Sequence, residues 1–184
     1  YKKPIDLNYK SAFFDRYSQI SIGKLITART TDELVENLKE TEYYAPLKKI
    51  KDTDNVTLYD YNLALDLYYY TSTWKEQKKI LKKSDLELFM RDRGSKIDLL
   101  NIQWIYRAKK YYNMKPADIY LMLIPIHYKL STELVKDMVE APGVEEFENV
   151  VIRTTYARHY NFKQNLTMEQ MYADCLHHLY TADR

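Results

Sequence analysis

One helix-like segment, KIDLLNIQWIYRAKK at residues 96–110, places a carboxylate, an amide and a guanidinium close together in the sequence. At 100° per residue, Asn101 lies in the middle of an apolar face, with Ile105 beside it. The other members of that face are Ile97, Trp104 and Ala108. A buried amide without a partner would cost about 1–3 kcal/mol. We therefore expect Asn101 to bond a neighbouring helix end or loop.

Asp98 and Arg107 fall on roughly opposite edges of the same apolar face. They cannot pair with each other, so each is expected to reach a different neighbour or the solvent. A catalytic carboxylate–amide pair is the alternative, but no histidine, nucleophile or second acid stands at a telling spacing. We interpret Asp98, Asn101 and Arg107 as residues that fix how adjacent helices dock.

The segment DCLHH, residues 174–178, could suggest a metal site. Cys175 and His178 could share a helix face with His177 turned away, and further ligands would have to come from His127 or His159. Cys175 is more simply explained as a small core residue or a free thiol. The sequence holds no Walker lysine motif, no G-x-G-x-x-G and no G-x-S-x-G. We therefore predict no catalytic residue, no metal, no cofactor and no small-molecule substrate.

The composition points to a helical globular protein. The chain has 184 residues, 46% of them hydrophobic and 29% charged, which is ordinary for a folded domain. Only 3 glycines and 5 prolines are present, which favours long helices with short connections over a turn-rich β-sandwich. The predicted fold class is all-α.

The charge pattern argues against nucleic-acid binding. Lys plus Arg number 28 against 26 Asp plus Glu, and the two signs are interspersed. The densest basic run, KEQKKILKK at 75–83, is followed at once by SDLE and is interpreted as a solvated helix end.

The longest apolar run, IYLMLIPI at 119–126, is far shorter than the roughly 20 residues that span a bilayer. With no signal-peptide pattern and a single cysteine, we expect a cytoplasmic location.

Helix boundaries can be predicted from capping residues. A helix is expected over 11–26, and Thr30 with Glu33 forms a capping box for a second helix that Pro46 closes. A long helix after KDTDN would carry Leu58, Tyr61, Leu65, Tyr68 and Tyr69 on one side. Another would open at Ser84 with Glu87 as its box partner, and Gly94 would mark a bend or a break in it. Pro116 begins a short helix, and Ser131 opens a helix that ends at Pro142–Gly143.

The chain also resembles itself at an offset of 113 positions. Ala28 then falls on Ala141, Glu33 on Glu146 and Tyr43 on Tyr156, without a gap. A second match, at an offset of 108, places Asp66 over Asp174. A period this long is unlike a short-repeat solenoid and indicates a duplicated or triplicated helical module.

These motifs resemble a known family. ALDLYYY (64–70), IDLLNIQWIYRAKK (97–110), LIPIHYKLS (123–131) and the Thr-x-Tyr at 154–156 are similar to the component that seats the central stalk on the membrane ring of vacuolar and archaeal-type rotary ATPases, called the d subunit or the C subunit. The family's motif matches Asp98, Asn101 and Arg107, and its Leu/Ile–Pro step matches Ile124–Pro125. The sequence departs from the family at Ile126–His127, where a small, often glycine-bearing turn is expected. The residues assigned to this structural motif are Asp98, Asn101, Arg107, Pro125, Asp66, Tyr43 and Tyr156.

The resemblance implies an all-helical, funnel-shaped fold of three related repeat units, of which this chain would be a partial member. Residues 1–184 would form one helical domain, with 1–50 as the end of the first repeat unit, 55–160 as the second and 165–184 as the start of the third. The implied function is non-catalytic coupling in a proton- or sodium-translocating ATPase, peripheral to the membrane. The partners would be central-stalk subunits and the membrane ring. The alternative is a free-standing helical adaptor of the same fold that binds another protein partner.

Overall fold

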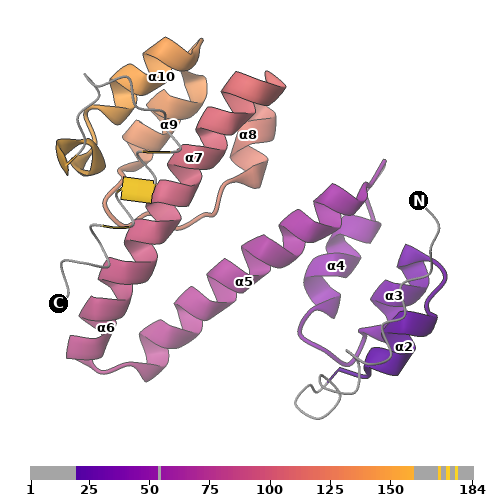
Figure 1. Cartoon of the computed structure of the whole chain (residues 1–184). Coiled ribbons are helices and arrows are strands. Elements are labelled where there is room, and N and C mark those ends of the chain that lie inside the picture. The colour runs from indigo at the N-terminus through magenta and orange to yellow at the C-terminus, as the bar shows by residue number, and fades with distance from the viewer. Residues whose placement is uncertain (1–19, 54, 160–169, 171–172, 175–176, 178–184) are drawn as a thin grey trace. The chain divides into compact units, whose positions relative to one another are not determined.

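The computed structural model describes residues 20–53, 55–159, 170, 173–174 and 177 (Figure 1). Within these residues all regular secondary structure is helical and no strand occurs, which confirms the all-α prediction. The chain forms two compact units that divide between Tyr68 and Tyr69, inside helix α5. They are called the N-terminal and C-terminal units and are described one at a time. The three-repeat division of residues 1–184 stays a prediction.

The N-terminal unit contains α2 (Ile22–Thr27), α3 (Thr31–Asn37), α4 (Tyr44–Lys51) and the first half of α5 (Leu58–Ile80). Its core is small, with Val35, Leu38 and Leu47 as the buried side chains. Thr30 caps α3 as predicted, because its hydroxyl accepts the Glu33 N–H at 3.1 Å. The Glu33 carboxylate accepts the N–H of Arg29, one residue earlier than the predicted box places it.

One prediction in this unit is wrong and another is confirmed. Pro46 does not close a segment, because it lies in the first turn of α4. Backbone N–H groups in the first turn have no partner within the helix, so a proline, which lacks this group, is tolerated there. The helix predicted after KDTDN exists as α5, and on its predicted side Leu58 is 74% exposed. Only Tyr61 and Leu65 of the predicted side pack against the N-terminal core. Of the helix predicted over 11–26, only its last part falls in the described residues, as α2.

The C-terminal unit contains the second half of α5, then α6 (Lys83–Phe89), the π-helical turn η1 (Met90–Gly94) and α7 (Ser95–Tyr112). It continues with α8 (Pro116–Met122), α9 (Thr132–Glu140), α10 (Val144–Val151) and the 3₁₀ helix η2 (Thr155–His159). The core lies where α7, α8, α9 and α10 meet, and its side chains include Ile105, Ile119, Met138, Val139 and Phe147. Pro116 begins α8, and the Ser131 hydroxyl caps α9 by accepting the Leu134 N–H at 3.2 Å, both as predicted.

The start of the long helix differs from prediction, and its middle carries the predicted interruption. Helix α6 begins at Lys83 with no side-chain cap, so Ser84 and Glu87 form no capping box. The interruption predicted at Gly94 takes the form of a π-helical turn, which Gly94 ends and which leads directly into α7.

The two segments that match at an offset of 113 share local backbone structure. Helix α3 begins at Thr31 and α10 begins at Val144, which is the equivalent position. The carbonyl of Leu38 accepts both the backbone N–H and the hydroxyl of Thr41, at 2.8 and 2.7 Å. The carbonyl of Val151 does the same for Thr154, at 2.9 and 2.7 Å. The common origin of the two segments stays a prediction.

Candidate functional site

The most highly bonded polar group of the described chain is the carboxylate of Asp98, on α7. It is fully buried and accepts the backbone N–H groups of Tyr128, Lys129 and Leu130 at 3.0, 2.6 and 3.2 Å. The hydroxyl of Tyr156 donates a fourth hydrogen bond at 2.7 Å. Three consecutive N–H groups and one phenol therefore surround a single negative charge.

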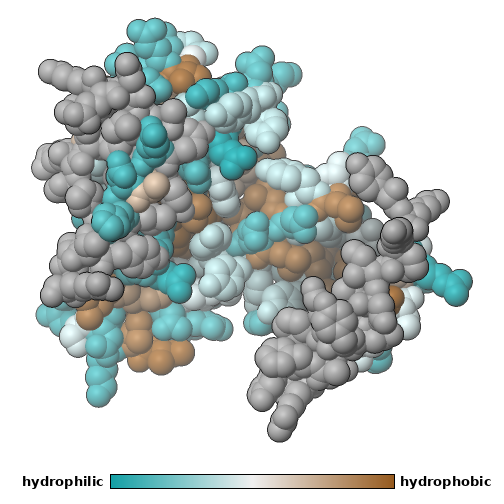
Figure 2. Space-filling model, in the orientation of Figure 1, coloured by the Kyte–Doolittle hydropathy of each residue, from teal (hydrophilic) through white to brown (hydrophobic). Residues whose placement is uncertain are grey.

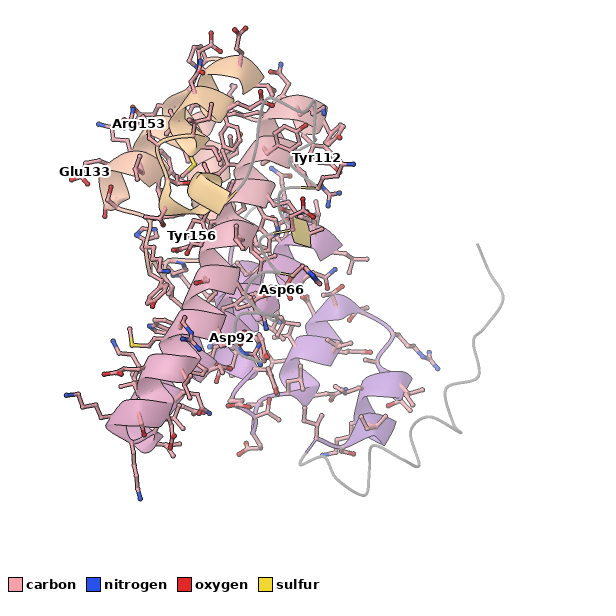
Figure 3. All side chains as sticks on the ribbon, turned by 60° about the vertical axis from the view of Figure 1, so that its left-hand side comes forward. Asp66, Asp92, Tyr112, Glu133, Arg153 and Tyr156 are labelled. Atoms are coloured by element: carbon pink, nitrogen blue, oxygen red, sulfur yellow. The ribbon has the colours of Figure 1, made fainter. Side chains whose placement is uncertain are left out.

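This arrangement explains how a charge can be buried here. An ionised carboxylate without partners would be very costly to bury, whereas charge-assisted hydrogen bonds are about twice as strong as neutral ones. Burial raises the pKa of Tyr156, and the charge of Asp98 and the hydrogen bond to it raise that pKa further. Tyr156 thus stays protonated and remains a donor over the physiological range. Figure 3 shows Tyr156 beside α7 in the C-terminal unit.

Asn101 makes the predicted contact with a loop. Its amide Nδ2 donates to the carbonyl of Ile124 and its Oδ1 accepts the N–H of Ile124, both at 3.0 Å. Both side-chain groups and both backbone groups are thus satisfied within a fully buried site. Asn101 therefore fixes the point where the chain leaves α8.

Pro125 follows directly and shapes the turn. The Ile126 N–H bonds back to the Ile124 carbonyl at 2.8 Å, which closes a three-residue turn around the proline. The fixed φ of proline suits the central position of such a turn. Ile126 and His127 stand where small residues are expected in the family. Ile126 is buried and His127 is exposed.

Lys109 is a site residue that sequence reasoning missed. Its Nζ donates to the carbonyls of Val139 and Ala141 at 2.7 and 2.6 Å, at the C-terminal end of α9. Burial lowers the pKa of Lys109. The signal was available, because Lys109 stands one turn beyond Ile105 on the stripe that carries Asn101.

Gly94 allows α7 to approach the same loop closely. A Cβ atom at Gly94 would lie 2.6 Å from Cγ and 2.7 Å from Cβ of Tyr128. Tyr128 also supplies one of the N–H groups that bind Asp98. The segment 123–131, called here the clamped loop, is therefore held by Gly94, Asp98 and Asn101 along one side of α7.

The remaining residues of the predicted motif do not join this site. Arg107 is exposed on α7 and, within the described part of the chain, forms no ion pair or hydrogen bond. Asp66 and Tyr43 belong to the N-terminal unit, where Asp66 is exposed. The ring of Tyr43 packs edge-on against Tyr68 with centroids 5.9 Å apart. Their assignment to a family motif stays a prediction.

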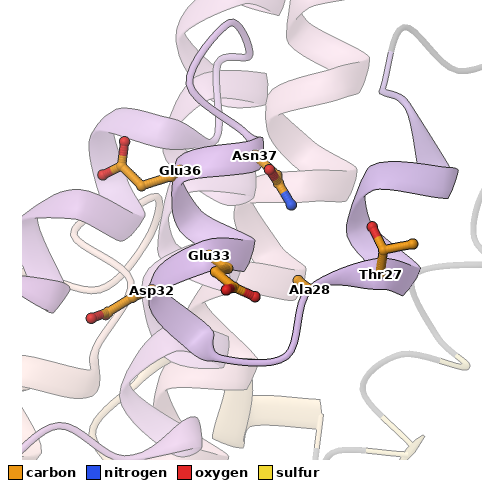
Figure 4. A pocket seen from close by; sticks show the side chains of 6 residues that line it. All are labelled: Thr27, Ala28, Asp32, Glu33, Glu36 and Asn37. Carbon is orange, nitrogen blue, oxygen red and sulfur yellow. The ribbon is translucent and has the colours of Figure 1, made fainter.

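A surface pocket of about 360 Å³ lies in the N-terminal unit between α2 and α3 (Figure 4). Its lining includes three acids, Asp32, Glu33 and Glu36, with Asn37 bonded across to the Lys24 carbonyl at 2.8 Å. Lys51 lies 3.8 Å from Asp32 and 3.6 Å from Glu36.

Among the described residues no group of three or more His, Cys, Asp or Glu could hold a metal ion. Cys175 and His178 lie outside the described residues, so the metal interpretation of that segment stays a hypothesis.

The fold and the site thus define an all-helical protein in which buried polar side chains hold one helix against its neighbours. The chain belongs to the family described as ATP synthase (C/AC39) subunit, which matches residues 3–182. This agrees with the resemblance found in the sequence.

Curated relatives are named as the C subunit of A-type ATP synthase. The protein of Methanosarcina mazei is 31% identical over 140 residues, which is 76% of this chain and 37% of that protein. The protein of Methanosarcina barkeri is 29% identical over 140 residues, with the same coverage. The chain therefore spans little more than a third of the length of these relatives. No solved structure matches the chain.

Proposed function

We propose that the chain is a non-catalytic coupling subunit of an A/V-type rotary ATPase. It would connect the central stalk to the membrane ring and transmit rotation between them. Catalysis and ion passage would belong to other subunits. The observation that carries the proposal is the family match over residues 3–182, together with relatives named as the C subunit of A-type ATP synthase.

The contacts of the C-terminal unit support a mechanical function. A part that transmits torque needs helices that do not shift against each other under load. Asp98 and Asn101 fasten α7 to the clamped loop, while Lys109 fastens it to the end of α9. These polar clamps have fixed geometry and few alternative partners, unlike apolar contacts that can slide.

The location also follows from this proposal. Within the described residues no helix combines the length and apolar character that crossing a membrane requires. A coupling subunit would instead be peripheral, held by the stalk and the ring on the cytoplasmic side.

The experiment is affinity capture of the tagged chain from native membranes, with its partners identified by mass spectrometry. Recovery of stalk and ring subunits together with the chain supports the proposal. Capture of unrelated proteins, without any ATPase subunit, would favour the adaptor alternative. An untagged strain processed in parallel controls for non-specific recovery.

A further inference from the structure

The α5–α6 turn carries a concentrated positive charge at the end of a helical hairpin. Five exposed lysines fall within nine residues of the C-terminal unit. They are Lys75, Lys78, Lys79, Lys82 and Lys83. None of them makes an ion pair or hydrogen bond within the described part of the chain. We call residues 75–88 the basic tip.

The helix dipole explains the position of only two of these five lysines. Lys78 and Lys79 lie in the last turn of α5, where a positive charge is favourable. Lys82 and Lys83 lie at the first positions of α6, where the dipole makes a positive charge unfavourable. Ser84, a good capping residue, is not used as the cap. Local helix stability therefore does not account for lysines at 82 and 83.

Two large apolar side chains of the basic tip are exposed. Ile80 is 72% exposed and Leu88 is 54% exposed. Figure 2 shows apolar and strongly polar surface side by side where α5 and α6 meet. Trp74 and Phe89 pack with ring centroids 5.6 Å apart, which holds the end of α5 and α6 together. The tip is thus a braced hairpin that presents lysines around an exposed isoleucine.

We propose that the basic tip contacts the surface of a membrane that contains anionic lipids. Clusters of four to eight basic residues attract anionic headgroups, and a neighbouring apolar side chain can enter the boundary between headgroups and acyl chains. An exposed isoleucine at the turn between two helices can insert into a fluid surface. Glu76, Asp85 and Glu87 also lie within the basic tip, but the stretch 78–83 carries basic charge alone. The proposal adds a lipid contact to the coupling function and does not depend on it.

The test is flotation of the whole 184-residue chain with vesicles of phosphatidylcholine alone or mixed with phosphatidylglycerol. We expect binding to the mixed vesicles only, with an affinity that falls as salt is raised. The variant Lys78→Gln/Lys79→Gln/Lys82→Gln should bind about a hundredfold more weakly, since each lysine near the surface is worth about fivefold. Ile80→Ser should weaken binding about five- to tenfold.

A matched control separates the tip from overall charge. Lys39, Lys49 and Lys136 are also exposed, make no ion pair within the described residues, and lie elsewhere. Their triple replacement by Gln should leave vesicle binding within about twofold. Circular dichroism checks that every variant stays helical.

Three results would overturn the proposal: no binding to anionic vesicles, equal binding to neutral vesicles, or equal loss in both triple variants. If the tip variant binds vesicles normally but no longer assembles with ATPase subunits, the tip is a contact for an acidic protein and the lipid proposal fails. A tip variant that loses vesicle binding but still recovers stalk and ring subunits supports the lipid contact and leaves the proposed function intact.

Discussion

At the scale of single residues, the docking of α7 depends on three polar side chains that each hold a different backbone segment. Asp98 binds three successive N–H groups, Asn101 binds both backbone groups of Ile124, and Lys109 binds two carbonyls at the end of α9. Each is buried or half-buried, so replacing any one leaves backbone groups unpaired away from water. The three clamps are therefore expected to govern the stability of the C-terminal unit.

Asn101→Leu tests the amide clamp. It leaves the N–H and carbonyl of Ile124 without their side-chain partner, so we expect a loss of about 2–3 kcal/mol in the free energy of unfolding. Urea unfolding followed by tryptophan fluorescence measures it, because Trp74 and Trp104 both lie in the C-terminal unit. Unfolding curves that coincide with the parent would rule out the clamp.

Lys109→Met tests the contact that sequence reasoning missed. The carbonyls of Val139 and Ala141 lose a charged donor, and we expect destabilisation of about 1–3 kcal/mol. Lys136→Met serves as the control, because Lys136 is exposed, and it should change stability by less than about 0.5 kcal/mol. Equal effects of the two substitutions in urea unfolding would contradict the role given to Lys109.

Tyr156→Phe should show a pH-dependent effect. The pKa of Tyr156 is raised in the folded state, so its contribution is fully present below the ordinary tyrosine pKa of about 10 and is lost as pH rises through the folded value. Near neutral pH the variant should be about 1–2 kcal/mol less stable, for want of the bond to Asp98. Above pH 10 the difference in free energy of unfolding between the parent and the variant should shrink by about 1.4 kcal/mol per pH unit. A gap that stays constant between about pH 8 and pH 11 would contradict a protonated, buried Tyr156.

At the scale of elements, local capping chemistry predicts some boundaries and competing contacts decide others. Thr30, Pro116 and Ser131 mark real helix starts because their effects lie within one turn of the chain. The prediction for Pro46 is wrong because a proline can end one segment or open the next, and the sequence alone does not distinguish the two.

Long-range contacts are beyond prediction for a physical reason. The spacing of Asp98 places it at the edge of an apolar face, but its three backbone partners lie 30 to 32 residues away in a loop without a regular period, and Tyr156 lies 58 residues away. The close approach that Gly94 permits could not be predicted, because its neighbour in space, Tyr128, is distant in sequence. The predicted bond of Asn101 is confirmed since a buried amide must have some partner, even though the pattern does not single out Ile124.

Gly94→Ala and Gly23→Ala form a matched pair at the element scale. At Gly94 the added Cβ would lie 2.6 Å from the base of the Tyr128 side chain, so overpacking of about 1–3 kcal/mol should outweigh the helix propensity gained. At Gly23, in α2, nothing lies within 4 Å of the added Cβ, and alanine should be neutral or stabilise by up to about 1 kcal/mol. Urea unfolding followed by circular dichroism compares the two, and stabilisation by both substitutions would refute the close approach of α7 to the clamped loop.

At the scale of the whole molecule, family membership and helical architecture agree, while the coupling function is our proposal. The chain covers 37% of the length of its relatives from Methanosarcina mazei and Methanosarcina barkeri. What the described part contributes is a helical unit in which α7 is fastened to the segments around it. Rigid fastening of this kind is what the proposed coupling function requires.

A coupling subunit should not use nucleotide itself. We expect no saturable heat on calorimetric titration of the chain with ATP, and no ATP hydrolysis by the isolated chain, because the sequence lacks a phosphate-binding loop. Saturable ATP binding would refute this expectation.

The most direct test is the coupling of ATP hydrolysis to ion uptake in membrane vesicles from cells with and without this chain. If the chain transmits rotation, vesicles that lack it should still hydrolyse ATP at the catalytic subunits but should no longer drive ion uptake, and expression of the chain should restore uptake. Uptake per ATP that is unchanged in its absence would contradict the account.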